Sequence, residues 1–253
     1  MSHILAFFKK YWITFLIFAG IFVAYKLVTD NGLVNTVLFP TPDQINAAFA
    51  NHAADMPKNF LASMSLLVPS LAIGTAIALA LGILMGTKKR ARETLYPIVY
   101  AVSVIPAILL SPFALHIAPT FAAASVFMIV YNTIWATLFG TITGIQTIDK
   151  RYLDNAATLC LTGFKRLTKV VLPAAMPSIL SGFVTSLRSS FIILVFAEMY
   201  SAQYGMGYFV KKNSDFGLYD NTWAGFLFMI VVLIIVMQIF EKLKNRALRW
   251  TSD

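Results

Sequence analysis

Long apolar segments separated by short polar loops make up most of this chain. Residues 59–86 and 94–148 contain no Asp, Glu, Lys or Arg. A helix that crosses a bilayer needs about 20 apolar residues, so the second stretch is long enough for two crossings and divides near His116–Pro119. The pattern therefore predicts an all-α, polytopic membrane protein with six transmembrane helices. They lie near residues 11–28, 59–86, 94–115, 120–148, 175–200 and 222–240.

The basic residues gather on one side of this six-span arrangement. They occupy the N-terminus, the loops after the second and fourth spans, and the C-terminal tail. Cytoplasmic loops of membrane proteins carry the excess of Lys and Arg, so both termini are predicted to be cytoplasmic. No small-residue cleavage site follows the first apolar segment, which is therefore interpreted as a retained span. These basic residues are Lys9, Lys10, Lys88, Lys89, Arg90, Arg92, Lys150, Arg151, Lys165, Arg166, Lys169, Lys242, Lys244, Arg246 and Arg249.

The amino-acid composition supports a membrane protein and argues against several functions. Of the 253 residues, 58% are hydrophobic and only 12% are charged, whereas soluble domains carry about 25% charged residues. The net charge of +9 arises in loops that set topology, so no nucleic-acid partner is expected. The three His residues are dispersed and Cys160 is the single Cys, so neither a metal site nor an intrachain disulfide is predicted. No GxxxxGK[ST] sequence is present, and the chain is not expected to be an enzyme that hydrolyses nucleotide itself.

The segment between the first two spans contains a helix-start signal. In Thr41–Pro42–Asp43–Gln44, Thr41 is a typical N-cap residue, Pro42 suits the first helical position, and Gln44 can bond back to the cap. We expect a short helix near residues 41–56 that lies at the outer membrane surface. This helix either packs against its own bundle or contacts an external partner.

Two charged residues fall inside the predicted fifth span. Arg188 and Glu198 are ten residues apart, which is about 15 Å along a helix, so they cannot pair directly within it. A charge in the membrane is costly and is expected to face the bundle interior, a partner subunit or water. One interpretation places both residues in a translocation path or gate. The other is structural: an ion pair with another helix, or a Glu198 that reaches the outer interface.

Small residues and prolines recur within the spans. Gly82-x-x-x-Gly86 and Gly140-x-x-x-Gly144 allow close helix contacts. Prolines at 69, 97, 106, 112 and 119 are expected to bend or interrupt the second to fourth spans.

The cytoplasmic loop after the fourth span is amphipathic. Leu153, Ala156, Ala157 and Cys160 recur at helical spacing and predict a short helix, which Gly163 ends by allowing a turn. A second short helix follows, with Phe164, Leu167 and Val171 on one face, and Leu172–Pro173 is expected to end it. Neither helix can bury its apolar face alone, so we expect both to pack beneath the bundle, dock on a partner, or do both.

This loop resembles the EAA loop of bacterial ABC importer permeases. That pattern runs Glu-Ala-Ala, three residues, Gly, and about a dozen residues to Leu-Pro. Aligned on Leu172–Pro173, Asp154 takes the Glu position, Asn155 and Ala156 take the Ala positions, and Cys160 takes the Gly position. Asp154 is a shorter acid, while Asn155 and Cys160 depart from the pattern, and Gly163 is a candidate to compensate for Cys160.

Further segments look like the nitrate/sulfonate/taurine-type branch of these permeases, and they span about residues 39–210 in the expected order. They are Phe39–Pro40–Thr41–Pro42, Ile105–Pro106, Pro112–Phe113, Asp149, residues 170–182, Ala197–Glu198–Met199 and Gly205–Met206–Gly207–Tyr208. The resemblance implies a single permease domain over residues 1–253 with type I ABC importer architecture in the bacterial inner membrane, and a coupling loop over 146–176.

The resemblance also implies partners and roles. Two ABC ATPase subunits, which bind ATP and Mg, would drive alternating access in two copies of this permease, and an external solute-binding protein would deliver the solute. The solute would be a small polar molecule such as a sulfonate or taurine, a nitrate-like anion or a vitamin precursor. The residues implied in ATPase coupling are Asp154, Asn155, Ala156, Ala157, Cys160, Gly163, Leu172 and Pro173, and Glu198 is placed near the pathway.

A gradient-driven secondary transporter or channel is the alternative from another class. It would use Arg188 and Glu198 directly and would need no ATPase. Six spans without an internal inverted repeat favour the importer.

Overall fold

The computed structural model describes the backbone of residues 2–251 and the side chains of residues 11–200 and 202–250. The regular structure of this part is helical throughout. The long helices are α1 (Ser2–Asp30), α3 (Asp55–Thr87), α4 (Lys89–Ser103), α6 (Phe121–Gln146), α9 (Leu172–Ser201) and α11 (Tyr219–Ala247). The shorter ones are α2 (Pro42–Asn51), α5 (Ser111–Ile117), α7 (Lys150–Thr158), α8 (Gly163–Arg166) and α10 (Met206–Asp215). Short 3-10 turns span Ala107–Leu110 and Arg249–Thr251.

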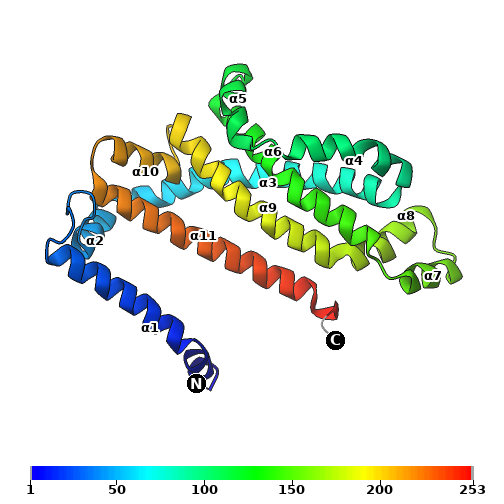
Figure 1. The fold of residues 1–253 in the computed structure, drawn as a ribbon, viewed down its shortest axis with the longest axis horizontal. Helices are drawn as coiled ribbons and strands as arrows, with labels where there is room; N and C mark the ends of the chain where they lie inside the picture. Colours follow the sequence, from blue (N-terminus) through cyan, green and yellow to red (C-terminus); the bar gives the residue numbers. More distant parts are fainter. Residues whose placement is uncertain (1, 252–253) are drawn as a thin grey trace.

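Figure 1 shows α3, α6, α9 and α11 running side by side. One end of this bundle carries α7 and α8 and is called the loop end below; the opposite end carries α2 and α10. Five described helices are long and apolar enough to cross a membrane, and a sixth crossing exists if the bent pair α4–α5 counts as one. This agrees with the six predicted spans. The side chains of Lys9 and Lys10 lie outside the described residues, and the orientation of the termini stays a prediction.

The predicted third span is not one straight helix. It breaks between Ser103 and Ala107, and the two parts meet at a bend of 79°. Pro106 has no N–H, so it cannot continue the helical ladder to the Val102 carbonyl. The Tyr131 hydroxyl of α6 lies 2.6 Å from the carbonyl oxygen of Val102 and 3.1 Å from that of Ile105, so it adds a hydrogen bond at the break. In Figure 1, α5 consequently stands away from the row of long helices.

The expected helix end at Leu172–Pro173 is wrong. Residues 163–201 form one continuous helix, because a π-helical turn over Leu167–Val171 joins α8 to α9. In this wide turn the Leu172 N–H bonds to the carbonyl of Leu167, five residues earlier. Pro173, which has no N–H, follows directly and is accommodated by the wider turn. The coupling loop is therefore built onto the fifth span rather than separated from it.

The helix α6 lies between α3 and α9 at very short distances. A β-carbon added to Gly82 of α3 would lie 2.6 Å from the Thr141 β-carbon, and one added to Gly182 of α9 would lie 2.5 Å from the Ala136 carbonyl oxygen. Such approaches require residues without side chains. The α6–α9 contact also holds a buried hydrogen bond of 2.9 Å between the Thr137 and Ser186 hydroxyls. The expected close contacts of the Gly82–Gly86 and Gly140–Gly144 segments are thus confirmed.

The short helix after the first span begins as predicted. The Thr41 side chain accepts from the Gln44 N–H, and the Gln44 side chain accepts from the Thr41 N–H, so the capping box is complete. The helix α1 reaches the rest of the molecule through its last turns. There the Tyr25 hydroxyl donates to the Pro40 carbonyl at 2.7 Å, and Lys26 pairs with Asp43 at 3.6 Å.

We predict that Gly182→Ala destabilises the protein by about 1–3 kcal/mol, because the new β-carbon forces α6 and α9 apart. The measurement is thermal unfolding of the detergent-purified chain, followed by size-exclusion chromatography. Gly20→Ala in α1 is the matched control, since nothing lies within 4 Å of its β-carbon. Equal unfolding temperatures for the two variants would contradict the close-packing argument.

Candidate functional site

The coupling loop begins with a strongly fixed helix start. Asp149 caps α7: its carboxylate accepts from the Arg151 backbone N–H at 2.9 Å. The same carboxylate receives the Arg151 guanidinium at 2.6 and 3.0 Å. These hydrogen bonds to Arg151 lower the pKa of Asp149 to about 2. The capping carboxylate is therefore charged at physiological pH and able to accept from the first turn of α7.

The sequence pattern placed Cys160 on the apolar face of the helix, and this prediction is wrong. Cys160 lies just beyond the end of α7. The helix stops at Thr158, and Cys160 adopts a left-handed backbone with φ of 52°. Its N–H bonds to the Ala157 carbonyl, and the next N–H, of Leu161, bonds to the Ala156 carbonyl. These two bonds make a Schellman ending, whose left-handed position favours glycine. Cys160 thus occupies the place where the family pattern has Gly. Gly163 also has a positive φ, of 53°, and starts α8.

The other predicted coupling residues divide into buried and exposed sets. Ala156 is buried beneath α7, whereas Asp154, Asn155 and Ala157 are exposed. Leu172 and Pro173 are half-buried in the continuous helix and join the loop to the span.

The sequence analysis missed part of the exposed apolar surface of this loop. Tyr152 is 57% exposed, Leu159 is 70% exposed, and Phe164 is 78% exposed. Tyr152 and Leu159 do not belong to the helical spacing that Leu153 and Ala156 share. An apolar surface at the end of a bundle, outside its own core, is typical of a protein contact.

A cavity of about 650 Å³ lies beside this surface. It is enclosed by α7, the start of α9 and Trp250 of the C-terminal turn, and Asp149, Asn155 and Lys169 give it a mixed polar lining. The C-terminal tail therefore reaches the coupling loop, which the sequence did not indicate.

Arg188 lies near the middle of α9 and is exposed. Ser181 and Thr185 are exposed on the same side, since they precede it by seven and three residues. In the described part of the chain no carboxylate forms an ion pair with Arg188. The intrachain ion pair considered for this residue is therefore not present.

Glu198 has the opposite environment. Its side chain is fully buried, and its Oε2 accepts from the Gly207 N–H at 2.7 Å. The structure does not bring Glu198 and Arg188 together: one points into the protein at the end of α9, and the other is exposed at mid-span.

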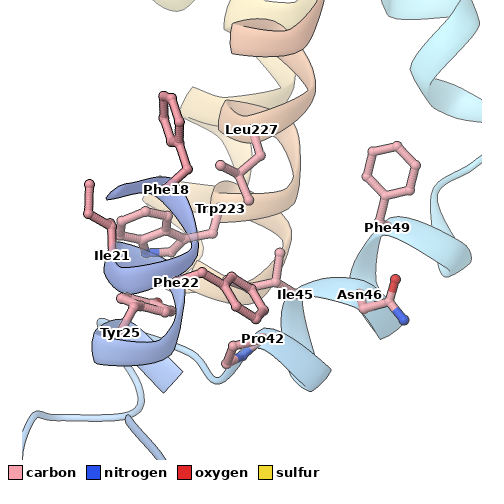
Figure 2. A pocket seen from close by; sticks show the side chains of 10 residues that line it. All are labelled: Phe18, Ile21, Phe22, Tyr25, Pro42, Ile45, Asn46, Phe49, Trp223 and Leu227. Atoms are coloured by element: carbon pink, nitrogen blue, oxygen red, sulfur yellow. The ribbon is translucent and has the colours of Figure 1, made fainter. Parts of the chain in front are cut away.

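A separate apolar pocket of about 580 Å³ lies between α1, α2 and α11. Figure 2 shows aromatic and aliphatic side chains around it, including Phe22, Ile45 and Trp223, with Asn46 among the few polar groups. Neither Arg188 nor Glu198 lines it, and its walls are mostly apolar.

Together, the apolar spans, the polar face of α9 and the loop built onto that same helix define a membrane transport subunit. The chain belongs to the family described as binding-protein-dependent transport system inner membrane component, which it matches over residues 74–250. It is thus a multi-pass inner-membrane subunit of an ATP-driven ABC importer, and membership of this family implies ATPase partners and a binding protein. The gradient-driven alternative is set aside.

Several curated relatives are similar over most of the chain. The putative aliphatic sulfonates transport permease protein SsuC of Bacillus subtilis is 24% identical over 97% of this chain and 90% of the relative. The nitrate import permease protein NrtB of Synechocystis is 27% identical over 76% and 70%. The bicarbonate transport system permease protein CmpB of Synechococcus elongatus is 26% identical over 75% and 66%. The expected branch is confirmed.

Solved structures show the same fold. An inward-facing structure of the MetNI methionine ABC transporter matches with a TM-score of 0.65 and 17% identity, over 79% of this chain and 97% of the other. An amino acid ABC transporter structure matches with a TM-score of 0.61 and 16% identity, over 80% and 97%. The type I importer architecture expected from the sequence is therefore confirmed.

We predict that Cys160→Gly stabilises the end of α7 by about 1 kcal/mol, because glycine adopts the left-handed backbone without strain. Hydrogen exchange of the Cys160 and Leu161 positions in the purified protein is the measurement, and exchange should slow several-fold. Cys160→Ala, which keeps a β-carbon, is the control and should leave exchange unchanged. Faster exchange in the glycine variant would contradict the strained ending.

Proposed function

We propose that this chain forms, as a homodimer with two ATPase subunits, the translocation path for a small anion. The names of the relatives support an anion, since sulfonates, nitrate and bicarbonate share a negative charge and small size. Arg188 supports it independently, as the exposed cation near the middle of α9. An external solute-binding protein delivers the anion and supplies most of the selectivity.

The exposure of Arg188 is the observation that carries this proposal. An arginine at mid-span that faced lipid would be strongly unfavourable, so the face that holds it must meet water or a second subunit. Ser181 and Thr185 extend the same face toward the loop end with hydroxyl groups. Three polar residues on one face of an otherwise apolar span are typical of a path. Arg188 then attracts the anion at the middle of the membrane.

The coupling loop is proposed to receive force from the ATPase. Asp154, Asn155 and Ala157 are exposed for contact, Ala156 packs the loop against the bundle, and Cys160 and Gly163 turn the chain. Leu172 and Pro173 lie where the loop continues into α9, so a displacement of α7 and α8 acts directly on the helix that carries Arg188. The ATPase subunits bind ATP and Mg, and this chain is proposed to bind no cofactor and to catalyse no reaction.

Co-purification from native cells in mild detergent tests the assembly. An ATPase with a P-loop, recovered at equal stoichiometry with two copies of this chain, is the expected result. Recovery of this chain intact and alone would overturn the proposal.

Ala157→Arg is predicted to reduce ATP-dependent uptake by about tenfold or more, because a long charged side chain on exposed Ala157 blocks the ATPase contact. Uptake of labelled taurine, nitrate and bicarbonate into proteoliposomes is measured, together with retention of the ATPase. Glu93→Arg, another exposed position near the loop end, is the control. Normal uptake by Ala157→Arg would remove Ala157 from the contact surface.

Arg188→Ala is predicted to lower uptake of the same anions by about tenfold, whereas Arg188→Lys keeps most of it, because the positive charge is what the anion meets. Arg90→Ala, which removes an exposed arginine of α4 away from this face, is the control. Wild-type uptake by Arg188→Ala would exclude Arg188 from the path. Loss of the homodimer in that variant would instead assign Arg188 to the subunit contact.

A further inference from the structure

The start of α10 is held by side chains from two other helices. Three consecutive backbone N–H groups have no partner within α10 itself and donate to these side chains. The Gly205 N–H donates to Asn59 Oδ1 at 3.2 Å, and the Met206 N–H donates to Ser63 Oγ at 2.9 Å. The third, from Gly207, donates to Glu198 at 2.7 Å. Asn59 and Ser63 belong to α3 and Glu198 to α9, so this cluster joins three helices.

Glu198 is at the centre of the cluster. Ser63 Oγ accepts from the Met206 N–H, next to the Gly207 N–H that Glu198 receives, so the two side chains hold neighbouring positions of the same turn. The carboxylate also lies at the N-terminal end of α10, where a negative charge is favoured by the helix dipole. Its Oε1 is buried and has no partner in the described residues. A carboxylate in this position is retained at a cost, which points to a role beyond filling space.

Two glycines allow the backbone of α10 to approach α9 closely. Gly205 has φ of 129°, and a β-carbon there would lie 2.5 Å from the Glu198 carboxyl carbon. A β-carbon on Gly207 would lie 2.7 Å from the Val195 carbonyl oxygen. Both glycines are therefore required for the backbone of α10 to reach α9. The family-like segments Ala197–Glu198–Met199 and Gly205–Met206–Gly207 prove to be two halves of one contact.

The cluster lies at the end of α9 that is far from the coupling loop. Residues 163–201 form one helix that starts in the coupling loop and ends beside Glu198. At the Glu198 end, α10 also packs on α2 and α11, with Phe209 buried among Ile45, Ala48 and Ala224. Figure 1 shows α9 running between these two ends.

We propose that Glu198 is a positioning residue that fastens α10 to α9 and α3, so that motion of the coupling loop is carried to the end where α2 and α10 lie. This inference rests on the proposed function. Glu198 touches no solute in this role; it acts through the backbone of Gly207. Of the two interpretations of Glu198, a path or gate residue and a structural residue, this proposal takes the structural one and gives it a partner, the backbone of Gly207.

The test combines Glu198→Ala with Glu198→Gln in the complete importer complex. The alanine variant should speed hydrogen exchange over residues 205–207 by at least about tenfold, because the buried hydrogen bond that holds the Gly207 N–H is lost. It should lower anion uptake per ATP hydrolysed by a similar factor while hydrolysis itself continues. The glutamine variant keeps an acceptor for the Gly207 N–H and should restore most of both. Asp215→Asn, in the exposed end of the same helix, is the matched control.

Three outcomes would overturn the inference. Unchanged exchange over residues 205–207 in Glu198→Ala would show that the carboxylate does not hold α10. Equal loss of uptake in the alanine and glutamine variants, with α10 still protected, would place the charge in the path. Faster exchange without any change in the uptake-to-hydrolysis ratio would make the contact purely structural.

Two further controls keep the result interpretable. Should Glu198→Ala not assemble, Ser63→Ala removes one member of the cluster more gently and should speed exchange at Met206 with a smaller loss of coupling. The wild-type complex in the same preparation separates this inference from the proposed function. If the wild-type complex shows no ATP-dependent anion uptake, the proposed function is wrong. The exchange measurement tests only whether Glu198 holds α10.

Discussion

The close contact of α6 with α3 on one side and α9 on the other is the constraint on which the remaining structure depends. Hydrophobic attraction between helices is weak inside a membrane, so the helices are held by close packing and by hydrogen bonds between side chains. Glycines at 82 and 182 permit the approach, and the hydroxyls of Thr137 and Ser186 bond across it. This packed core gives α9 a fixed side and leaves its other side exposed, which is where Arg188 lies.

The helix α9 then connects every feature relevant to transport. At the loop end, the π-helical turn allows it to begin in the coupling loop despite Pro173. At mid-span it presents Arg188 to the exterior of the single chain, and at its far end it buries Glu198 against α10. One continuous helix thus joins the coupling loop, the exposed Arg188 and the contact with α10. The helical backbone is unbroken from Gly163 to Ser201, so the two ends belong to one element.

Much of the coupling loop could be predicted from the sequence, because its signals are local. The cap at Asp149 and the apolar position of Ala156 follow from neighbours within a few residues, whereas the left-handed backbone of Cys160 was indicated only by the alignment with the family pattern. The continuation through Leu172–Pro173 could not be predicted in this way. A proline disfavours continuation of an α-helix, but here a π-helical turn precedes Pro173, and Val171 and Ala175 on either side of it are buried in one cluster.

The sequence by itself determined the number and place of the apolar segments, the basic bias of the loops and the membership of a transport family, since all three are written in composition and short motifs. It also marked Arg188 and Glu198 as unusual. Only the tertiary structure decided that one of them is exposed and the other is buried. The two charges occupy similar apolar surroundings in the sequence, and their environments differ because of residues far away in the chain: the free energy of a charge inside a membrane depends on what lies opposite to it, and for Glu198 that is the backbone of α10.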